Sequence, residues 1–157
     1  MILGNGCGRA HMREKRVEEA AAKCIVVVDA SKLCPRGLGP SSALPVEITP
    51  FCHEFTLRAV AALPAIAASG ATPQLRLGSS ANNKRDGDTP ARTDNGNYIV
   101  DLSFARPLAE PASAAAQLKA TTGVVEHGLF CGMASEVIVA SRDKGVYTLA
   151  AHVTARL

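Results

Sequence analysis

The chain has 157 residues, 47% of them hydrophobic, which is enough for one ordinary domain or two small ones with a true core. Its net charge of +3 comes from interspersed Lys and Arg, and aromatic residues make up only 4%. Both features argue against nucleic acid as a partner. No apolar run approaches the ~20 residues of a membrane span, and the first residues resemble neither a signal peptide nor a transit peptide.

The cysteines and histidines give no sign of a metal site. The five cysteines are scattered and include no Cys-x-x-Cys pair, which argues for a reducing compartment and against a disulfide frame. The four histidines share no ligand spacing. Gly4-x-Gly6-x-Gly8 is not a dinucleotide fingerprint, because that motif needs a preceding strand and a downstream acid. We therefore expect neither a metal nor a cofactor.

The first predicted element is a helix over residues 10–23. Its spacing predicts a solvated stripe of Lys15, Glu19 and Lys23, with Val17, Ala20 and Ala21 on the opposite face. The run 24–29 that follows is short, β-branched and not alternating. This pattern is typical of a central parallel strand covered on both sides, as in a doubly wound α/β layer.

Candidate site residues surround this helix and strand. A glycine-rich segment, residues 4–8, precedes the helix and lets backbone N–H groups approach an anion. Glu14 falls in the first turn of the helix, and Lys32 follows the strand. Because open α/β sheets bind ligands at the carboxyl ends of their strands, we expect the loop, Glu14 and Lys32 to converge on one small phosphorylated substrate.

A turn-rich connection over residues 34–42 is the best candidate domain boundary. Beyond it the order strand, helix, strand, strand, helix, strand predicts a ferredoxin-like split βαβ arrangement. Pro64 should kink or shorten the first of these helices, and the polar loop 78–92 should bury nothing. A terminal hairpin turns at residues 143–145. The predicted strands are 44–48, 74–77, 97–104, 124–130, 137–140 and 146–149, and the predicted helices are 52–68 and 108–121.

Five separated blocks of this sequence resemble the carboxyl-terminal part of type A ribose-5-phosphate isomerase, in the same order and at similar spacing. The residues in these blocks, and the pair Phe51-Cys52, are most similar to those of the plant and algal versions. The blocks are residues 13–15 (Arg-Glu-Lys), 26–32, 44–48, 93–101 and 123–130.

The resemblance implies an enzyme that interconverts ribose 5-phosphate and ribulose 5-phosphate without a metal. It implies an α/β fold in which a partial Rossmann-like parallel-sheet layer, residues 1–43 with 133–157 returning to it, joins a ferredoxin-like α+β small domain, residues 44–132. The family's amino-terminal Thr-Gly-Ser and Asp-Gly-Ala-Asp segments are not among the 157 residues, so the chain is expected to be a truncated form. A homo-oligomer in the cytoplasm or chloroplast stroma is also implied.

By the same resemblance, Glu14 matches the catalytic carboxylate that moves a proton between C1 and C2, and Lys32 matches a lysine that holds the phosphate. Gly6 and Gly8 keep the flexible substrate loop. Asn5 stands where the family has a lysine, and it carries no charge to stabilise an enediolate oxygen. This departure leaves an alternative open, in which the chain is a non-catalytic homologue or a ferredoxin-like module for subunit contacts.

Other polar residues are predicted to have structural roles. His127, in an apolar strand, is more often a satisfied core histidine than a ligand or base. Asp94 and Asn95 are typical turn formers at the entry to a strand. Asp101 is expected in a strand-end salt bridge or in solvent.

Overall fold

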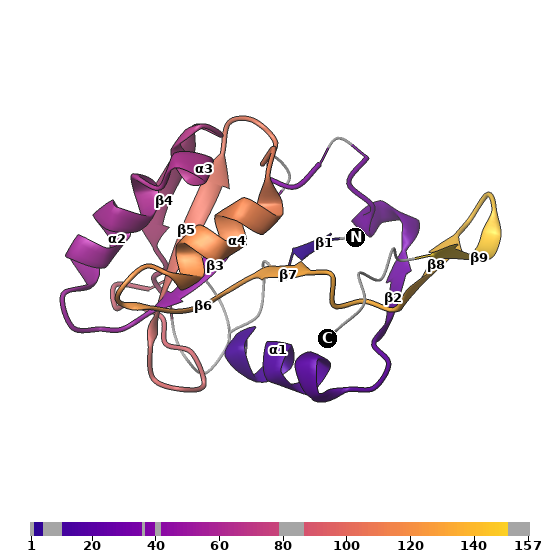
Figure 1. Ribbon diagram of the computed structural model, residues 1–157, viewed down its shortest axis with the longest axis horizontal. Helices are drawn as coiled ribbons and strands as arrows, with labels where there is room; N and C mark the ends of the chain where they lie inside the picture. Colours follow the sequence, from indigo (N-terminus) through magenta and orange to yellow (C-terminus); the bar gives the residue numbers. More distant parts are fainter. Residues whose placement is uncertain (1, 5–10, 36, 40–41, 79–86, 151–157) are drawn as a thin grey trace.

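The computed structural model describes residues 2–4, 11–35, 37–39, 42–78 and 87–150 (Figure 1). The helices are α1 His11–Ala20, α2 His53–Ala61, α3 Pro64–Ala67 and α4 Pro111–Lys119, and η1 is a 3-10 turn, Ala30–Lys32. The strands are β1 Ile2–Gly4, β2 Ile25–Asp29, β3 Leu44–Ile48, β4 Ala71–Leu75, β5 Tyr98–Phe104, β6 Val124–His127, β7 Leu129–Cys131, β8 Glu136–Ser141 and β9 Gly145–Ala150.

The larger sheet has the strand order β4-β5-β3-β6, with every neighbouring pair antiparallel. With α2 and α3 between β3 and β4 and α4 between β5 and β6, this is the predicted ferredoxin-like arrangement. Figure 1 shows α2, α3 and α4 together on one side of the sheet. The core between helices and sheet is apolar, and its fully buried members are Val46, Ile48, Val60, Ile66, Val100, Leu102, Ala114 and Leu118.

Two prolines of this unit, Pro64 and Pro111, stand at helix starts. Pro64 begins α3, so the helix predicted over 52–68 is divided into α2 and α3, as its position indicated. Pro111 begins α4. A proline is tolerated in the first turn because the N–H that it lacks would have no partner inside the helix.

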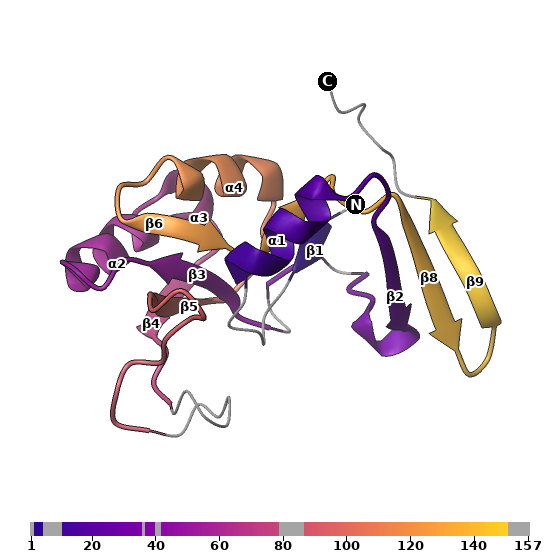
Figure 2. The ribbon, with the colours of Figure 1, turned by 90° about the horizontal axis from the view of Figure 1, so that it is seen from below.

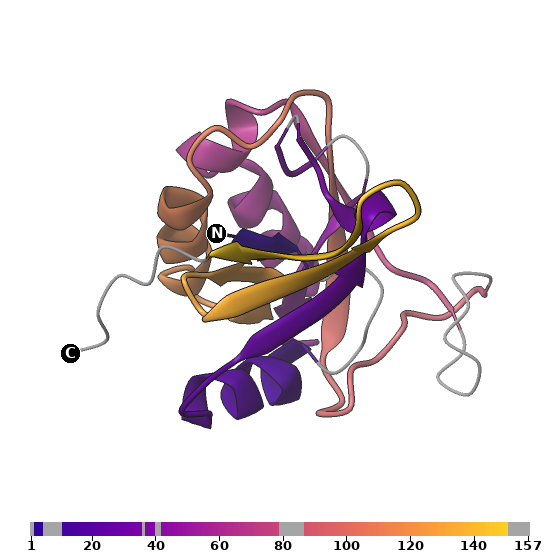
Figure 3. The same cartoon turned by 90° about the vertical axis from the view of Figure 1, so that its right-hand side faces the viewer.

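A three-stranded sheet, called the smaller sheet below, lies at the other end of the molecule and has the order β2-β8-β9 (Figures 2 and 3). β2 pairs with β8 in parallel, and β8 and β9 form the predicted antiparallel hairpin. The prediction that the 24–29 strand is covered on both sides is wrong for the described residues. β2 is an edge strand there, with Ile25 47% and Val27 70% exposed.

Two further predictions need correction. The strand predicted over 124–130 is interrupted at Gly128, whose N–H donates to the Pro45 carbonyl at 2.9 Å, and β7 pairs with β1 instead of continuing β6. The loop 78–92 does bury a residue, since Ala91 is 4% exposed and its N–H donates to the Arg76 carbonyl. Residues 79–86 of that loop lie outside the described part.

The α/β fold class is confirmed: a small parallel-containing sheet accompanies a ferredoxin-like unit. The domain boundaries at residues 43 and 132 stay predictions. Among the described residues, no helix has the length and hydropathy needed to cross a membrane.

Candidate active site

Helix α1, which carries Glu14, packs through charged and polar side chains. Its buried residues are His11 and Lys15, four apart and therefore on one face of the helix. Val17, by contrast, is 71% exposed. The predicted solvated stripe is thus wrong for Lys15, and the predicted opposite face is wrong for Val17 and Ala20, which are both exposed. The reason lies in the surface beneath α1, which offers acceptors for a lysine rather than an apolar groove.

That surface is the face of the larger sheet opposite to its helices. Glu47 of β3 and Glu126 of β6 stand directly opposite one another, and Glu47 also pairs in register with Ile99 of β5. Asp101 lies two residues further along β5, so it points to the same side. All three carboxylates are buried, with exposures of 0% for Glu47, 7% for Glu126 and 8% for Asp101. Buried charges of this kind require partners.

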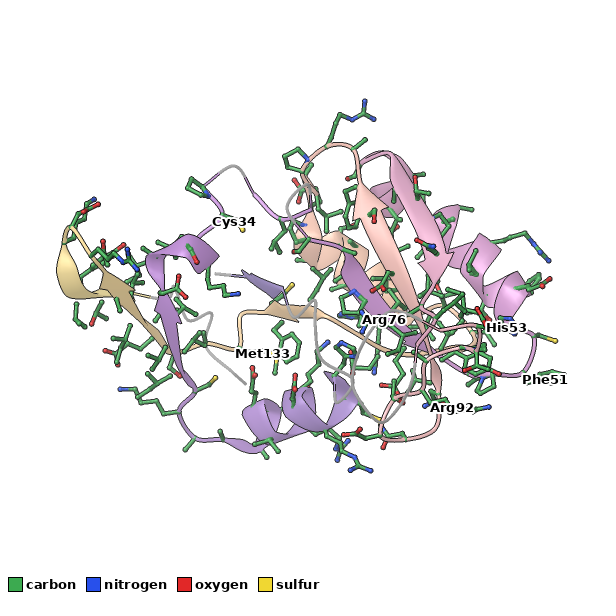
Figure 4. All side chains as sticks on the ribbon, turned by 180° about the vertical axis from the view of Figure 1, so that it is seen from behind. Cys34, Phe51, His53, Arg76, Arg92 and Met133 are labelled. Atoms are coloured by element: carbon green, nitrogen blue, oxygen red, sulfur yellow. The ribbon has the colours of Figure 1, made fainter. Side chains whose placement is uncertain are left out.

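Glu126 and Asp101 pair with three cations from separate parts of the chain, whereas Glu47 Oε1 accepts from the neutral donors Thr93 and Asn97. Lys15 Nζ lies 2.6 Å from Glu126 Oε1, and Lys119 Nζ from α4 lies 2.9 Å from Glu126 Oε2. Arg76 binds Asp101 through two parallel hydrogen bonds, Nε to Oδ2 at 2.8 Å and Nη2 to Oδ1 at 2.5 Å. For Asp101 the predicted salt bridge is confirmed, but its strand-end position and the solvated alternative are wrong, because Asp101 is buried in the middle of β5. In Figure 4 Arg76 lies toward the middle of the molecule, whereas Phe51, His53 and Arg92 gather at its outer end.

Two histidines are buried in this charged layer. The pKa of His11 is lowered to about 4 by burial and then by the neighbouring Arg76. The pKa of His127 is lowered to about 4 by burial and then by Lys15. The core assignment of His127 is confirmed, since it is 5% exposed and its Nδ1 lies 3.2 Å from Lys15 Nζ. Neither His11 ring nitrogen has a hydrogen-bond partner among the residues that the structure describes.

Glu14 itself is half-buried in the first turn of α1. Glu18 follows four residues later, on the same side of the helix. Burial and then the charge of Glu14 raise the pKa of Glu18. The two carboxylates therefore share one side of α1, and the charge of Glu14 disfavours the ionised form of Glu18.

The residue before Glu14 ties the start of α1 to the turn between β4 and β5. Arg13 Nη2 donates to the Asp94 carbonyl at 2.9 Å, and Arg13 Nε donates to Asn95 Oδ1 at 3.3 Å. Asp94 and Asn95 form the predicted turn, which Gly96 completes at a φ of 81° that favours glycine. Glu47 Oε1 fixes the two ends of this turn by accepting hydrogen bonds from Thr93 Oγ1 and Asn97 Nδ2.

Lys32 ends η1, directly beyond the carboxyl end of β2, and is exposed. η1 is capped by Asp29, whose Oδ1 accepts from the Ser31 N–H at 2.8 Å. This hydrogen bonding lowers the pKa of Asp29, with a smaller contribution from Lys32. Glu14 in α1 and Lys32 in η1 are thus separated in the chain by one element, β2. Asn5, Gly6 and Gly8 lie outside the described residues, so convergence of the whole set stays a prediction.

No cluster of three or more His, Cys, Asp or Glu side chains suited to a metal ion occurs within the described ranges. The charged layer, however, was not predicted from the sequence. Arg13, Lys15, Glu126 and Glu47 all fall in blocks that carry the family resemblance. The sequence does not show which of these charges pair. Lys15 and Glu126, for example, are 111 residues apart and are brought together only by the fold.

Fold and site together define an α/β protein in which a ferredoxin-like sheet holds a helix with a half-buried carboxylate. The model of the family ribose 5-phosphate isomerase A (phosphoriboisomerase A) matches residues 1–144. The chain therefore belongs to the ribose 5-phosphate isomerase A family, as its five sequence blocks indicated.

Relatives from distant organisms agree. The chain is 44% identical over 143 residues to ribose-5-phosphate isomerase A of Chloroflexus aurantiacus, covering 91% of this chain and 54% of the relative. It is 45% identical over 143 residues to a probable chloroplastic ribose-5-phosphate isomerase 3 of Arabidopsis thaliana, covering 90% and 48%. The chain thus spans about half the length of these relatives.

Solved structures give the same result. Ribose 5-phosphate isomerase from Plasmodium falciparum superimposes with a TM-score of 0.84 at 33% identity, covering 96% of this chain and 60% of that one. A D-ribose-5-phosphate isomerase in complex with phospho-erythronic acid superimposes with a TM-score of 0.79 at 32% identity, covering 96% and 59%.

Proposed function

We propose that this chain provides the catalytic carboxylate and part of the substrate site of a ribose-5-phosphate isomerase. Glu14 removes the proton from C2 of open-chain ribose 5-phosphate while the aldehyde oxygen gains a proton, which gives an enediol. Glu14 then returns its proton to C1 as the C2 hydroxyl loses one, which gives ribulose 5-phosphate. The net change moves hydrogen between neighbouring carbons and requires no cofactor.

The observation that carries the proposal is the placement of Glu14 in the first turn of α1. The residues on either side of Glu14 are both bound to the larger sheet or to its β4–β5 turn. Arg13 binds the turn at residues 94–95, and Lys15 binds β6. Proton transfer to and from carbon needs a positioned base, and a helix on a rigid sheet is more precise than a loop.

The substrate class follows from the phosphate-binding residues. Lys32 supplies a point charge, and Gly6 and Gly8 are of the residue type that lets a backbone N–H approach an anion. Asn5 lies in the same segment as a neutral donor. A relative in complex with phospho-erythronic acid supports a sugar-phosphate ligand for this chain as well.

This function places the chain in the pentose phosphate pathway or, in a photosynthetic cell, the Calvin cycle. We further propose that it works as a homo-oligomer, in the cytoplasm or chloroplast stroma. Because it spans about half of its relatives, we expect the isolated 157-residue chain to turn over ribose 5-phosphate well below the ~1 per second typical of slower enzymes.

The alternative is a non-catalytic homologue or subunit-contact module, and Asn5 favours it. A lysine at that position would stabilise the enediolate oxygen, whereas asparagine offers only a neutral hydrogen bond. An Asn5→Lys variant distinguishes the two: in an enzyme it should raise kcat, and in a non-catalytic homologue it should leave the reaction undetectable.

The decisive experiment uses a completed chain, in which these 157 residues are fused to the portion of the Chloroflexus aurantiacus relative that lies outside the match. Glu14→Gln keeps shape but removes the basic lone pair, so kcat should fall roughly 100-fold or more while KM changes little. Glu54→Gln, on the exposed side of α2, is the matched control and should change neither. A Glu14→Gln protein within a few-fold of the parent kcat would remove Glu14 from the mechanism.

A further inference from the structure

We propose that Lys15 is a positioning residue, which fixes the direction of Glu14 by joining α1 to β6 through Glu126 and the His127 carbonyl. The proposal rests on the proposed function for the chemistry of Glu14. The attachment of α1 is a separate claim, and it can be tested without catalysis.

The Lys15 ammonium is fully engaged. Its Nζ donates to Glu126 Oε1 at 2.6 Å and to the His127 carbonyl at 2.7 Å, and it lies 3.2 Å from His127 Nδ1. An ammonium has three N–H donors, so these three acceptors satisfy it. It also lies 5.0 Å from the centre of the Phe130 ring, within the range of a cation–π contact.

The Glu126 carboxylate, which accepts from Lys15, also has hydrogen bonds to both of its oxygens. Glu126 Oε1 also accepts from the His127 N–H at 3.0 Å, and Glu126 Oε2 accepts from Lys119 at 2.9 Å. Hydrogen bonds from Lys15 and Lys119 outweigh burial and lower the pKa of Glu126 to about 2. Glu126 therefore keeps its charge at any pH at which the enzyme would work, and Lys15 always has an anion to bind.

A second attachment prevents α1 from turning about its axis. Arg13 binds the turn at residues 94–95, and that turn is fixed by Glu47 Oε1, which accepts from Thr93 Oγ1 and from Asn97 Nδ2, each at 2.8 Å. Arg13 and Lys15 are about 200° apart around a helix of 3.6 residues per turn. Glu14, between them, is therefore held by two constraints that point in different directions.

Lys119 provides a matched control. It binds the same carboxylate at a similar distance, but its side chain is 57% exposed and it belongs to α4. Replacing Lys119 weakens the pairing of Glu126 without detaching α1. A difference between the Lys15 and Lys119 variants therefore reports on α1 and not on the general cost of an unpaired Glu126.

The first test is hydrogen exchange on the 157-residue chain. In Lys15→Met the α1 amides should exchange roughly 10-fold faster or more, and by a larger factor than those of β3 and β5, which follow only the change in global stability. Lys119→Met should leave α1 at the parent rate, and Lys15→Arg, which keeps the charge, should fall between. If Lys15→Met does not fold, Glu126→Gln provides the same comparison. Parent-like exchange of α1 in the folded variant would overturn the proposal.

The second test measures kcat and KM in the completed chain. A displaced base lowers kcat by about 10- to 100-fold with little change in KM, so Lys15→Met should show this split and Lys119→Met should not. If Glu14→Gln abolishes turnover while Lys15→Met keeps the parent kcat, the positioning role is wrong and the proposed function stands. If Glu14→Gln keeps the parent kcat, the proposed function fails, and hydrogen exchange still decides whether Lys15 attaches α1.

Discussion

β2 and β3 are both five-residue strands from apolar runs, yet they differ in how far their side chains are buried. All five residues of β3 are buried, including Glu47, whereas burial in β2 alternates and leaves Val27 70% exposed. β3 has a strand on each side and helices over one face, whereas β2 pairs only with β8 among the described strands. An apolar run therefore indicates a capacity for burial, and its neighbours decide how much of that capacity is used.

The largest effect expected from this comparison is on stability. Ile48→Ala in β3 should cost about 2–5 kcal/mol, because it leaves a cavity at a fully buried position. Val27→Ala in β2 should change the free energy of unfolding by no more than about 0.5 kcal/mol. Urea denaturation of both variants provides the comparison. Equal losses would mean that β2 is as well covered as β3.

The charged layer under α1 should make stability depend on pH. His11 has a pKa of about 4 in the fold and an ordinary value of 6.5 when unfolded, so the unfolded chain binds the proton first. Stability should therefore be full above pH 6.5 and decline as the pH falls from 6.5 toward 4, by roughly 3 kcal/mol for this residue.

His11→Leu isolates that contribution. It removes two buried nitrogens that have no hydrogen-bond partner within the described part of the chain, so it should raise stability at pH 5 and flatten the decline. His127, with its pKa lowered to about 4, should maintain a remaining slope of the same sign. Denaturation midpoints of the parent and His11→Leu at pH 7, 6 and 5 measure this. Parallel pH profiles would show that His11 does not titrate as described.

The open face of the smaller sheet should make the isolated chain self-associate. Val27 and Val146 are 70% and 74% exposed, and a free apolar strand edge is a template for pairing with another chain. Light scattering should give a mass that rises with concentration, and Val27→Lys should reduce it. A mass equal to one chain at all concentrations would indicate that this face is closed.

The smallest effect is expected at Lys23, which pairs with Glu136 on the surface. Its Nζ lies 2.9 Å from Glu136 Oε2, but the lysine side chain is 59% exposed. Lys23→Met should therefore cost about 1 kcal/mol or less, whereas Lys15→Met, which removes one partner of a buried pair, should cost about 3–5 kcal/mol. Similar losses would contradict the distinction drawn here between the two lysines.

Sequence reasoning predicted most of the ferredoxin-like unit, because its signals are local. β3 has the predicted bounds, and Pro64 divides the helices as expected. The break at Gly128 was missed because it depends on a hydrogen bond to Pro45, a residue 83 positions earlier. Strand interruptions of this kind are decided by distant backbone groups.

The candidate site was predicted only in part, for a related reason. Glu14 and Lys32 were identified by resemblance, but the contacts that fix α1 join residues far apart in the sequence. Helical spacing placed Lys15 in a solvated stripe because lysines at such positions are usually exposed. A buried anion on β6 reverses that preference, and no local pattern around Lys15 indicates it.

The central claim, that Glu14 carries the proton between C1 and C2, is tested most directly by hydrogen isotope exchange in D2O with the completed chain. NMR of ribulose 5-phosphate formed from ribose 5-phosphate should show deuterium at C1 with the parent protein, because a carboxyl proton exchanges with solvent before it is returned. Glu14→Gln should lose this incorporation together with turnover, while Glu54→Gln retains both. Deuterium entering C1 at the parent rate in Glu14→Gln would contradict the account.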